Sequence, residues 1–246
     1  MPRTIVAANW KMHKTAADTV AFLDTFLAEL ADTPPHVDVF IAPPFTAIPA
    51  ASVRLAGSRV SLGAQTMHWD LEGPFTGEIS APMLKEFGVS FVILGHSERR
   101  TSCCETDAGV NRKTHAALTQ GLLPLIAVGE TAAERSEGAA DRRVVHQTRA
   151  ALDGVPPGAF GRLALAYEPI WAIGTGNNCD PVEADRMMGL IRNAVPGLEE
   201  TPILYGGSMK AENVADYTAK PNINGGLIGG ASLDAHGFAD LVRRAR

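Results

Sequence analysis

The sequence predicts an α/β protein with a single domain, a closed (β/α)8 barrel of eight parallel strands ringed by helices. Eight short apolar runs recur along the 246 residues, without the polar alternation expected of strands that have one face in water. Helical patterns lie between the runs with no linker or change in composition, which is typical of parallel βαβ units. The runs are Thr4–Ala8, Val37–Ala42, Arg59–Gly63, Phe91–Leu94, Leu123–Val128, Leu163–Tyr167, Ile203–Tyr205 and Gly226–Ile228.

An open doubly wound sheet is the competing architecture. No G-x-G-x-x-G motif follows the first run, which counts against the dinucleotide-binding form of that sheet. Barrels of eight strands also reach this length as one domain. We therefore expect one barrel domain over residues 1–246.

The clearest helical pattern covers Thr15–Leu30. Its apolar residues fall on one helical face, and Thr15 with Asp18 resembles a capping box. The other expected helices are Met83–Phe87, Arg142–Leu152, Asp185–Val195 and Phe238–Arg244.

Composition and charge argue against several kinds of binding partner. A net charge of −5 and a pI of about 5.8 give no attraction to nucleic acid or an anionic membrane. No apolar run has the length of a membrane span, and the N-terminus lacks a signal-peptide pattern. Cys103, Cys104 and Cys179 match neither a disulfide framework nor a zinc site. We expect a cytoplasmic protein that binds no metal, nucleic acid or membrane.

In such a barrel the functional residues lie just past the C-terminal ends of the strands. Asn9 and Lys11 follow the first run, where an ammonium and an amide can bind an anionic substrate. His96 follows the fourth run. If a helix starts at Ser97, its dipole disfavours imidazolium and keeps the His96 ring neutral.

Glu168 follows the sixth run, so a carboxylate lies at the tip of a buried strand. Pro169 biases the backbone of Glu168 away from the helical region. Ile170 and Trp171 come next and form an apolar flap, followed by a glycine-containing segment that begins at Gly174. The segment therefore combines a candidate base with a candidate lid.

Small residues follow the last two runs, at Gly206-Gly207-Ser208 and Gly229-Gly230-Ala231-Ser232. Each group precedes an expected helix start, where backbone N–H groups bind anions, and barrels often bind phosphate at these two tips. The expected phosphate pocket is lined by Lys11, Gly174, Ser208, Gly229 and Gly230. We expect Glu168 and His96 to lie opposite each other beside it.

A carboxylate facing a neutral imidazole beside a phosphate anchor suits proton abstraction next to a carbonyl. Glu168 would take a carbon-bound proton and return it to the neighbouring carbon. His96, with Lys11, would stabilise the enediolate oxygens as they gain charge. The flap would exclude water from the intermediate.

Six motifs form a specific combination along the chain. They are Asn9-Trp10-Lys11, Phe75-Thr76-Gly77-Glu78, His96-Ser97-Glu98-Arg99-Arg100, Tyr167-Glu168-Pro169, Tyr205-Gly206-Gly207-Ser208 and Gly229-Gly230-Ala231-Ser232. On these motifs the chain resembles the triosephosphate isomerase family over essentially its whole length. The resemblance implies a TIM barrel that interconverts dihydroxyacetone phosphate and D-glyceraldehyde 3-phosphate, in glycolysis and gluconeogenesis, without a cofactor.

The resemblance also implies roles that the residues alone do not. Glu98 would be an accessory active-site acid, and Tyr205 and Ser208 would hold the closed flap. The protein would be a homodimer in which the loop Gln65–Glu78 inserts into the neighbouring subunit, with Thr76 reaching its active site.

Several positions depart from the family pattern. Ala127 stands where Cys is common, and Thr66 where Asn is common. The flap ends Asn177-Asn178-Cys179, which implies altered flap opening because asparagine tolerates left-handed backbone. Asn224 replaces an Asp that pairs with the Arg at 192, so the contact with Arg192 would be neutral–charged and weaker.

Three alternatives stay open on the sequence. The first is a paralogous isomerase of a tetrulose phosphate on the same scaffold. The second is a barrel lyase that uses Lys11 as a Schiff-base nucleophile, which requires a desolvated lysine. The third is a phosphate-binding barrel without catalysis.

Overall fold

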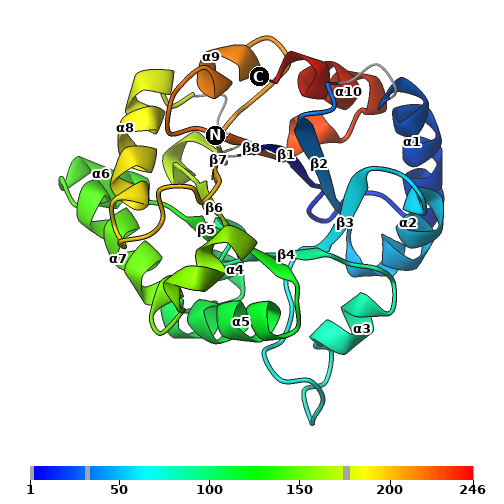
Figure 1. The fold of residues 1–246 in the computed structure, drawn as a ribbon, viewed down its shortest axis with the longest axis horizontal. Coiled ribbons are helices and arrows are strands. Elements are labelled where there is room, and N and C mark those ends of the chain that lie inside the picture. The colour runs from blue at the N-terminus through cyan, green and yellow to red at the C-terminus, as the bar shows by residue number, and fades with distance from the viewer. Residues whose placement is uncertain (1–2, 31–33, 174–177, 246) are drawn as a thin grey trace.

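The strands close into the expected barrel in the computed structural model, which describes residues 3–30, 34–173 and 178–245. They pair in parallel and in chain order, and β8 returns to pair with β1 (Figure 1). The strands are β1 (Thr4–Asn9), β2 (Val37–Ala42), β3 (Val60–Ala64), β4 (Phe91–Leu94), β5 (Leu123–Val128), β6 (Ala164–Tyr167), β7 (Ile203–Tyr205) and β8 (Gly225–Ile228). Every predicted run agrees with its strand to within one residue at each end.

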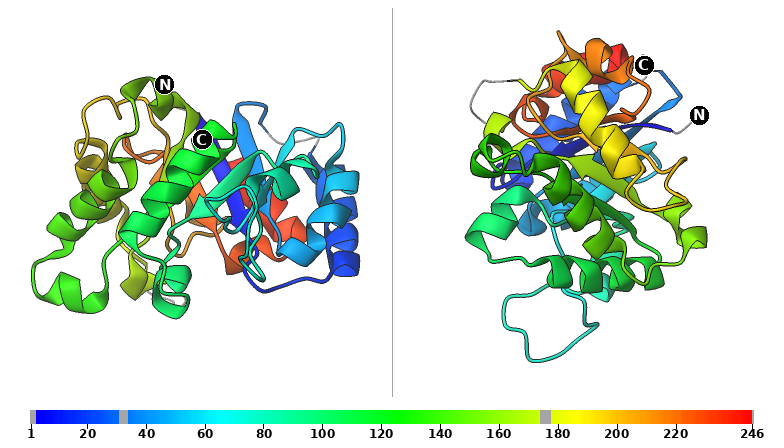
Figure 2. Two further views of the ribbon diagram at one scale, coloured as in Figure 1. Left: turned by 90° about the horizontal axis from the view of Figure 1, so that it is seen from below. Right: turned by 90° about the vertical axis from the view of Figure 1, so that its left-hand side faces the viewer.

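Helices cover the outside of the barrel all the way round (Figures 1 and 2). The α-helices of the described residues are α1 (Ala16–Glu29), α2 (Ile48–Leu55), α3 (Ala81–Lys85), α4 (Ser97–Ser102), α5 (Asp107–Thr119), α6 (Ala132–Ser136), α7 (Ala140–Leu152), α8 (Pro181–Arg192), α9 (Val214–Thr218) and α10 (Ala235–Arg244). Short 3-10 turns follow two of the strand ends that matter below, at η4 (Ile170–Ala172) and η5 (Gly230–Ser232).

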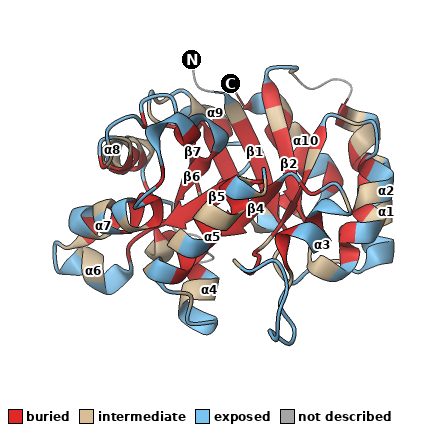
Figure 3. Ribbon diagram, turned by 60° about the horizontal axis from the view of Figure 1, so that its bottom comes forward, coloured by how far each residue is buried: buried red, intermediate tan, exposed pale blue. Residues whose placement is uncertain are grey.

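The ribbon of the strands is coloured mostly as buried (Figure 3). Residues on both faces of the sheet are buried, which explains why the strands read as continuous apolar runs. One face contributes to a small cluster of buried residues inside the barrel, and Ile5, Ala127 and Leu227 belong to it. The other face packs against the helices, as Val6 and Leu165 do. Ala127, where the family commonly has Cys, is thus a fully buried interior residue.

Phe91 is buried inside the barrel next to β3. Its ring stacks on Phe40 with centroids 4.6 Å apart. A Cβ on Gly63 would lie 2.1 Å from the Phe91 ring, so the glycine in β3 makes room for this aromatic.

The expected helices are present as α1, α3, α7, α8 and α10. Thr15 caps α1 and forms the predicted capping box with Asp18. Helix α5 was not predicted, because two polar residues, Lys113 and Thr114, interrupt the apolar residues on its buried face. Lys113 is neutralised by an ion pair with Glu105, and this contact between side chains is invisible to periodicity.

The loop between β3 and α3 projects away from the barrel (Figures 1 and 2). It contains the segment Gln65–Glu78, in which residues 70 to 78 are all exposed. Leu71 and Phe75 are among the large apolar side chains that it presents to solvent, 49% and 39% exposed. At the base of the loop Thr66 is buried and accepts a hydrogen bond from Lys113 Nζ at 3.1 Å.

Candidate active site

The predicted site residues within the described ranges all follow the C-terminal ends of strands, and parallel strands bring these ends to one rim of the barrel. Asn9 ends β1, with Lys11 two residues later. His96 follows β4 and caps the N-terminus of α4. Glu168 directly follows β6, and Gly229 directly follows β8.

Glu168 and His96 contact each other directly. Glu168 Oε1 lies 2.9 Å from His96 Nε2, and Glu168 Oε2 accepts the backbone N–H of Ser97 at 2.8 Å. The Glu168 residue is only 2% exposed, and a buried carboxylate needs such donors. The two residues therefore face each other, as expected, and they are in direct contact.

The hydrogen bonds define the tautomer of His96. Nδ1 accepts the backbone N–H of Glu98 at 3.2 Å, at the start of α4, so this nitrogen carries no proton. Nε2 then carries the proton and donates to Glu168. The predicted helix after His96 is confirmed. The hydrogen bond at Nδ1 favours a neutral ring, whereas the contact with Glu168 favours protonation.

The contact between Glu168 and His96 also shifts the pKa values of both side chains. Burial raises the pKa of Glu168, but His96 and the hydrogen-bond donors of Ser97 outweigh it and hold the pKa below its usual range. Burial lowers the pKa of His96, but the carboxylate of Glu168 outweighs it and raises the pKa. The hydrogen bond at Nδ1 opposes that rise, because imidazolium has no acceptor to offer the Glu98 N–H.

Two glycines leave the space that Glu168 occupies. A Cβ on Gly129, at the tip of β5, would lie 1.8 Å from the carbonyl oxygen of Glu168. A Cβ on Gly206, at the tip of β7, would lie 2.8 Å from Glu168 Cγ. Gln147 Oε1, on α7, accepts the N–H of Gly129 at 2.8 Å and holds the first of these turns in place.

Lys11 lies on the other side of the site in a left-handed backbone conformation, with φ +53°. Its Nζ forms a 2.6 Å ion pair with Glu98 Oε1, and its N–H donates to Asn9 Oδ1 at 3.1 Å. Gln65 Nε2 donates to the carbonyl of Lys11 at 2.9 Å, which ties this turn to β3. The structure thus places Glu98 beside Lys11 rather than in the wall of the cavity described next.

An open cavity of about 420 Å³ lies over this rim. It joins the candidate base and electrophile to the glycine-rich tips of β7 and β8. The lining residues are Asn9, Lys11, His96, Glu168, Ile173, Gly206, Gly207, Ser208, Met209, Lys210, Leu227, Gly229, Gly230 and Ala231. Of the predicted phosphate-binding residues, Lys11, Ser208, Gly229 and Gly230 line it, and Gly174 lies outside the described residues.

The expected helix starts at the two tips are only partly present. After β8 a 3-10 turn, η5, begins at Gly230. After β7, α9 begins only at Val214, because the chain first makes a turn in which Asn213 Oδ1 accepts the N–H of Lys210 at 2.8 Å. Ser208 therefore lies in a turn rather than at a helix N-terminus.

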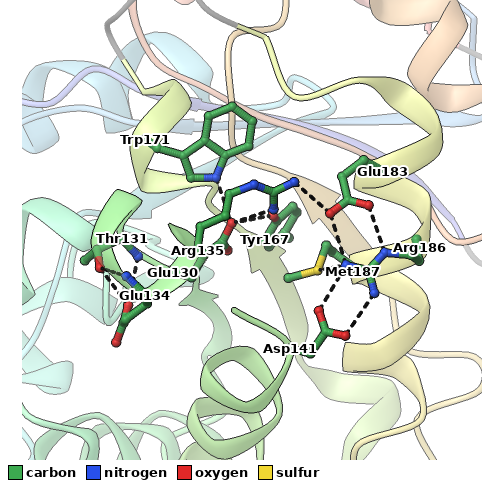
Figure 4. Close-up of polar contacts among 10 residues, drawn as sticks. All are labelled: Glu130, Thr131, Glu134, Arg135, Asp141, Tyr167, Trp171, Glu183, Arg186 and Met187. Carbon is green, nitrogen blue, oxygen red and sulfur yellow. Dashed lines mark hydrogen bonds and ion pairs between the residues drawn. The ribbon is translucent and has the colours of Figure 1, made fainter. Parts of the chain in front are cut away.

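Sequence reasoning missed Glu130, two residues past β5 and fully buried (Figure 4). Its Oε1 accepts hydrogen bonds from Trp171 Nε1 at 2.7 Å and Tyr167 Oη at 3.1 Å, and Arg135 lies 3.3 Å away. Burial raises the pKa of Glu130 although these donors act to lower it. Its position at a strand tip was the signal available in the sequence.

Through Glu130 the start of the flap is tied to the helices outside the barrel. The Arg135 guanidinium lies over the Trp171 ring, 4.7 Å from its centroid, and pairs with Glu183 at 2.9 Å. Arg186 joins Glu183 to Asp141 on α7, so helices α6, α7 and α8 share one polar network (Figure 4). Within the described part of the flap, Ser208 Oγ also donates to the carbonyl of Ala172 at 3.2 Å.

The positions that depart from the family pattern take ordinary structural roles where they are described. Asn224 Oδ1 accepts a hydrogen bond from Arg192 at 2.9 Å, so the predicted neutral–charged contact is present. Cys179 is buried, which raises the pKa of its thiol to about 12, whereas Cys103 and Cys104 are exposed. Asn177 lies outside the described residues.

Over the ranges 3–30, 34–173 and 178–245, no group of three or more His, Cys, Asp or Glu side chains is arranged to hold a metal ion. In the same ranges, every helix is too short or too polar to cross a membrane.

A (β/α)8 barrel that holds a carboxylate and an imidazole over one rim cavity, beside an ammonium and glycine-rich strand tips, is a barrel enzyme suited to proton transfer. Comparison with known proteins narrows this class. The family model described as Triosephosphate isomerase matches residues 4–245. The chain belongs to this family, as its motifs predicted, and is an aldose–ketose isomerase.

Individual relatives agree with this assignment along the full chain. The chain is 49% identical to a triosephosphate isomerase of Acaryochloris marina over 98% of this chain and 99% of that protein. It is 46% identical to one of Herpetosiphon aurantiacus, covering 99% of both proteins. A third, from a Nostoc species, is 47% identical over 98% of this chain and 99% of its own length.

Proposed function

We propose that this protein interconverts dihydroxyacetone phosphate and D-glyceraldehyde 3-phosphate through an enediolate, as its family name indicates. The observation that carries the proposal is the direct contact of Glu168 with His96 on the wall of the cavity that Lys11 and the glycine-rich tips also line. Base, electrophile and anion-binding groups therefore face one substrate-sized space.

Glu168 is the base in this proposal. A lowered pKa keeps the carboxylate ionised at neutral pH. The side chain turns from the N–H of Ser97 toward the substrate and takes a proton from the carbon next to the carbonyl. It then returns that proton to the neighbouring carbon, so that one group serves both halves of the isomerisation.

His96 is the electrophile. Its Nε2–H, which donates to Glu168, is free to donate to the substrate oxygens once the carboxylate has turned away. The neutral ring donates its Nε2 proton to the oxygen that gains charge and takes the hydroxyl proton of the neighbouring oxygen, so the proton on the oxygens moves as the carbon-bound one does. The N–H of Glu98 at Nδ1 holds the ring in this tautomer. Asn9 Oδ1 orders the turn that carries Lys11, whose ammonium adds positive charge on the substrate side.

The phosphate group lies against Ser208, Gly229 and Gly230 in our proposal, with Lys11 beside it. A Cβ on Gly229 would be 3.4 Å from Lys11 Cε, so the end of the Lys11 side chain lies next to this glycine. Gly174 is proposed to complete the phosphate site from the flap. Glu98 is proposed as an accessory acid that acts through its ion pair with Lys11.

The arrangement of Lys11 favours isomerase over Schiff-base chemistry. A nucleophilic lysine is desolvated, whereas the Lys11 side chain is 27% exposed and ion-paired with Glu98. The tetrulose phosphate alternative differs only in substrate length, and the names of the relatives favour the three-carbon substrate.

We propose a homodimer formed by the loop Gln65–Glu78, in which Thr76 reaches the active site of the other subunit. The exposed Leu71 and Phe75 support this, because a projecting loop with apolar side chains suits insertion into a partner. Replacing Phe75 with Glu should shift the protein to monomer in analytical ultracentrifugation. Replacing Val53 on α2 with Glu, at an apolar site that is also exposed, should not.

We also propose that residues 1–246 form one domain and that the enzyme works in the cytoplasm, in glycolysis and gluconeogenesis. The three free cysteines support this location, because disulfides are rare in cytosolic proteins.

A coupled assay in both directions tests the activity, with three-carbon and four-carbon ketose phosphates compared. A larger kcat/KM for the four-carbon compound contradicts the proposal. Borohydride trapping that labels Lys11 also contradicts it. A crystal structure with a phosphorylated enediolate mimic should place one ligand oxygen near His96 and the phosphate at Ser208, Gly229 and Gly230.

A further inference from the structure

Lys210 is a lining residue of the active-site cavity for which the reaction has no assigned use. It lies two residues past Ser208, in the turn between β7 and α9, and is exposed at the mouth of the cavity. None of the steps proposed above needs a second ammonium. Its place on the wall therefore suggests a role outside the chemical steps.

The backbone around Lys210 is held firmly. Its N–H donates to Asn213 Oδ1 at 2.8 Å, and its carbonyl accepts the N–H of Val214 at 2.9 Å. Asn213 Nδ2 also lies 3.4 Å from the carbonyl of Ser208, which closes the turn on the phosphate side of the cavity. The root of the Lys210 side chain is thus fixed next to the proposed phosphate site.

The charges on the cavity wall distinguish Lys210 from Lys11. The ammonium of Lys11 is committed to Glu98 at 2.6 Å. Glu168 adds a negative charge to the wall, and His96 beside it is neutral in the tautomer that its hydrogen bonds favour. Within the described part of the chain, Lys210 is the one cationic side chain on the wall whose charge is not paired with a carboxylate.

We propose that Lys210 is an anion-capture residue at the rim of the active site, which draws the phosphate dianion of the substrate into the cavity and raises its association rate. The inference rests on the proposed function, because it takes a phosphorylated substrate as the ligand. A chain with net charge −5 repels a dianion at long range, and a single unpaired cation at the mouth offsets this repulsion locally. Lys210 is a binding residue in this account and takes no part in proton transfer.

The test compares Lys210→Gln with Lys220→Gln. Both changes remove one positive charge, but Lys220 lies between α9 and β8, at the opposite end of the barrel. At low ionic strength Lys210→Gln should lower kcat/KM by about threefold to tenfold, with little change in kcat. The difference should shrink to within about twofold at 0.5 M salt, because screening removes it. Lys210→Arg should restore the wild-type value.

Inorganic phosphate gives a second readout that does not depend on turnover. Its Kd, measured by calorimetry, should rise in Lys210→Gln by a similar factor and stay unchanged in Lys220→Gln. Equal behaviour of the two glutamine variants at low salt overturns the proposal. A loss in Lys210→Gln that persists at 0.5 M salt, or that lies in kcat, also overturns it. A wild-type enzyme without isomerase activity would refute the proposed function, while the phosphate titration would still decide the role of Lys210.

Discussion

The two ends of the barrel use their polar side chains in opposite ways. At the N-terminal end, Arg192 donates to the carbonyls of Glu199 and Thr201 at 2.8 and 2.9 Å, and to Asn224 Oδ1 at 2.9 Å. At the C-terminal end, Glu168 and His96 satisfy each other and line an open cavity. The first set closes the structure with main-chain partners, whereas the second can exchange its partners for a substrate. Stability and chemistry are therefore separated along the barrel axis.

The clearest test of this contrast is to replace the proposed base, Glu168. Glu168→Gln should lower kcat by about 10³–10⁴-fold, within the range that a positioned general base supplies. The free energy of unfolding should stay the same or rise, because active-site groups are placed for reaction rather than for stability. Steady-state kinetics and urea unfolding on the same variant measure the two effects. More than a tenth of the wild-type kcat would contradict the role of Glu168.

The opposite result is expected at the other end. Arg192→Met should cost about 2–3 kcal/mol of unfolding free energy, because several carbonyls and Asn224 lose their donor. The kcat of the folded variant should stay within about twofold of wild type. Arg162→Met, at an exposed arginine that precedes β6, is the matched control and should be nearly neutral. A large fall in kcat for Arg192→Met would show that the two ends are coupled.

Asn224→Asp should strengthen the contact with Arg192 at the same end of the barrel. A carboxylate would accept from Arg192 and from the N–H of Ile203 as Asn224 Oδ1 does, but with a charge-assisted bond. We expect a gain of about 0.5–1 kcal/mol in unfolding free energy at neutral pH, with kcat unchanged. In the Arg192→Met background the gain should vanish. A gain that persists there would mean that the aspartate acts without its arginine.

The smallest expected effect concerns Glu130, which lies at the functional end but is bonded like a structural residue. Burial raises its pKa above the usual 4.5, so the folded protein holds this proton to higher pH than the unfolded chain does. Its contribution to stability is therefore present at low pH and lost as the pH rises through the folded-state pKa. Glu130→Gln removes this titration.

The measurement is the difference in Tm between wild type and Glu130→Gln across pH. Wild type should lose stability relative to the variant as the pH rises above the usual carboxyl pKa of 4.5. Glu137→Gln, at an exposed position that ends α6, should show no such trend. An opposite slope for Glu130→Gln would mean that Arg135 and the other donors outweigh burial.

The sequence by itself determined the strands and the residues at their tips. Buried parallel strands need apolar side chains on both faces, so each strand is visible as a local run. Parallel pairing then brings the C-terminal ends to one rim, so Asn9, Lys11, His96 and Glu168 could be assigned to one site before any contact was known. The capping box at Thr15 was equally local and equally predictable.

Only the tertiary structure decided how those residues are bonded. The contact of Glu168 with Ser97 joins positions 71 residues apart, and that of Trp171 with Glu130 spans 41 residues. No periodicity records such pairs, because each depends on how neighbouring strand ends orient their side chains. For the same reason α5 escaped prediction: its buried Lys113 is tolerated only because Glu105 and Thr66 receive it. The local sequence pattern thus specified the strands and the rim at which the site lies. Contacts between distant segments specified which charged side chains pair with each other there.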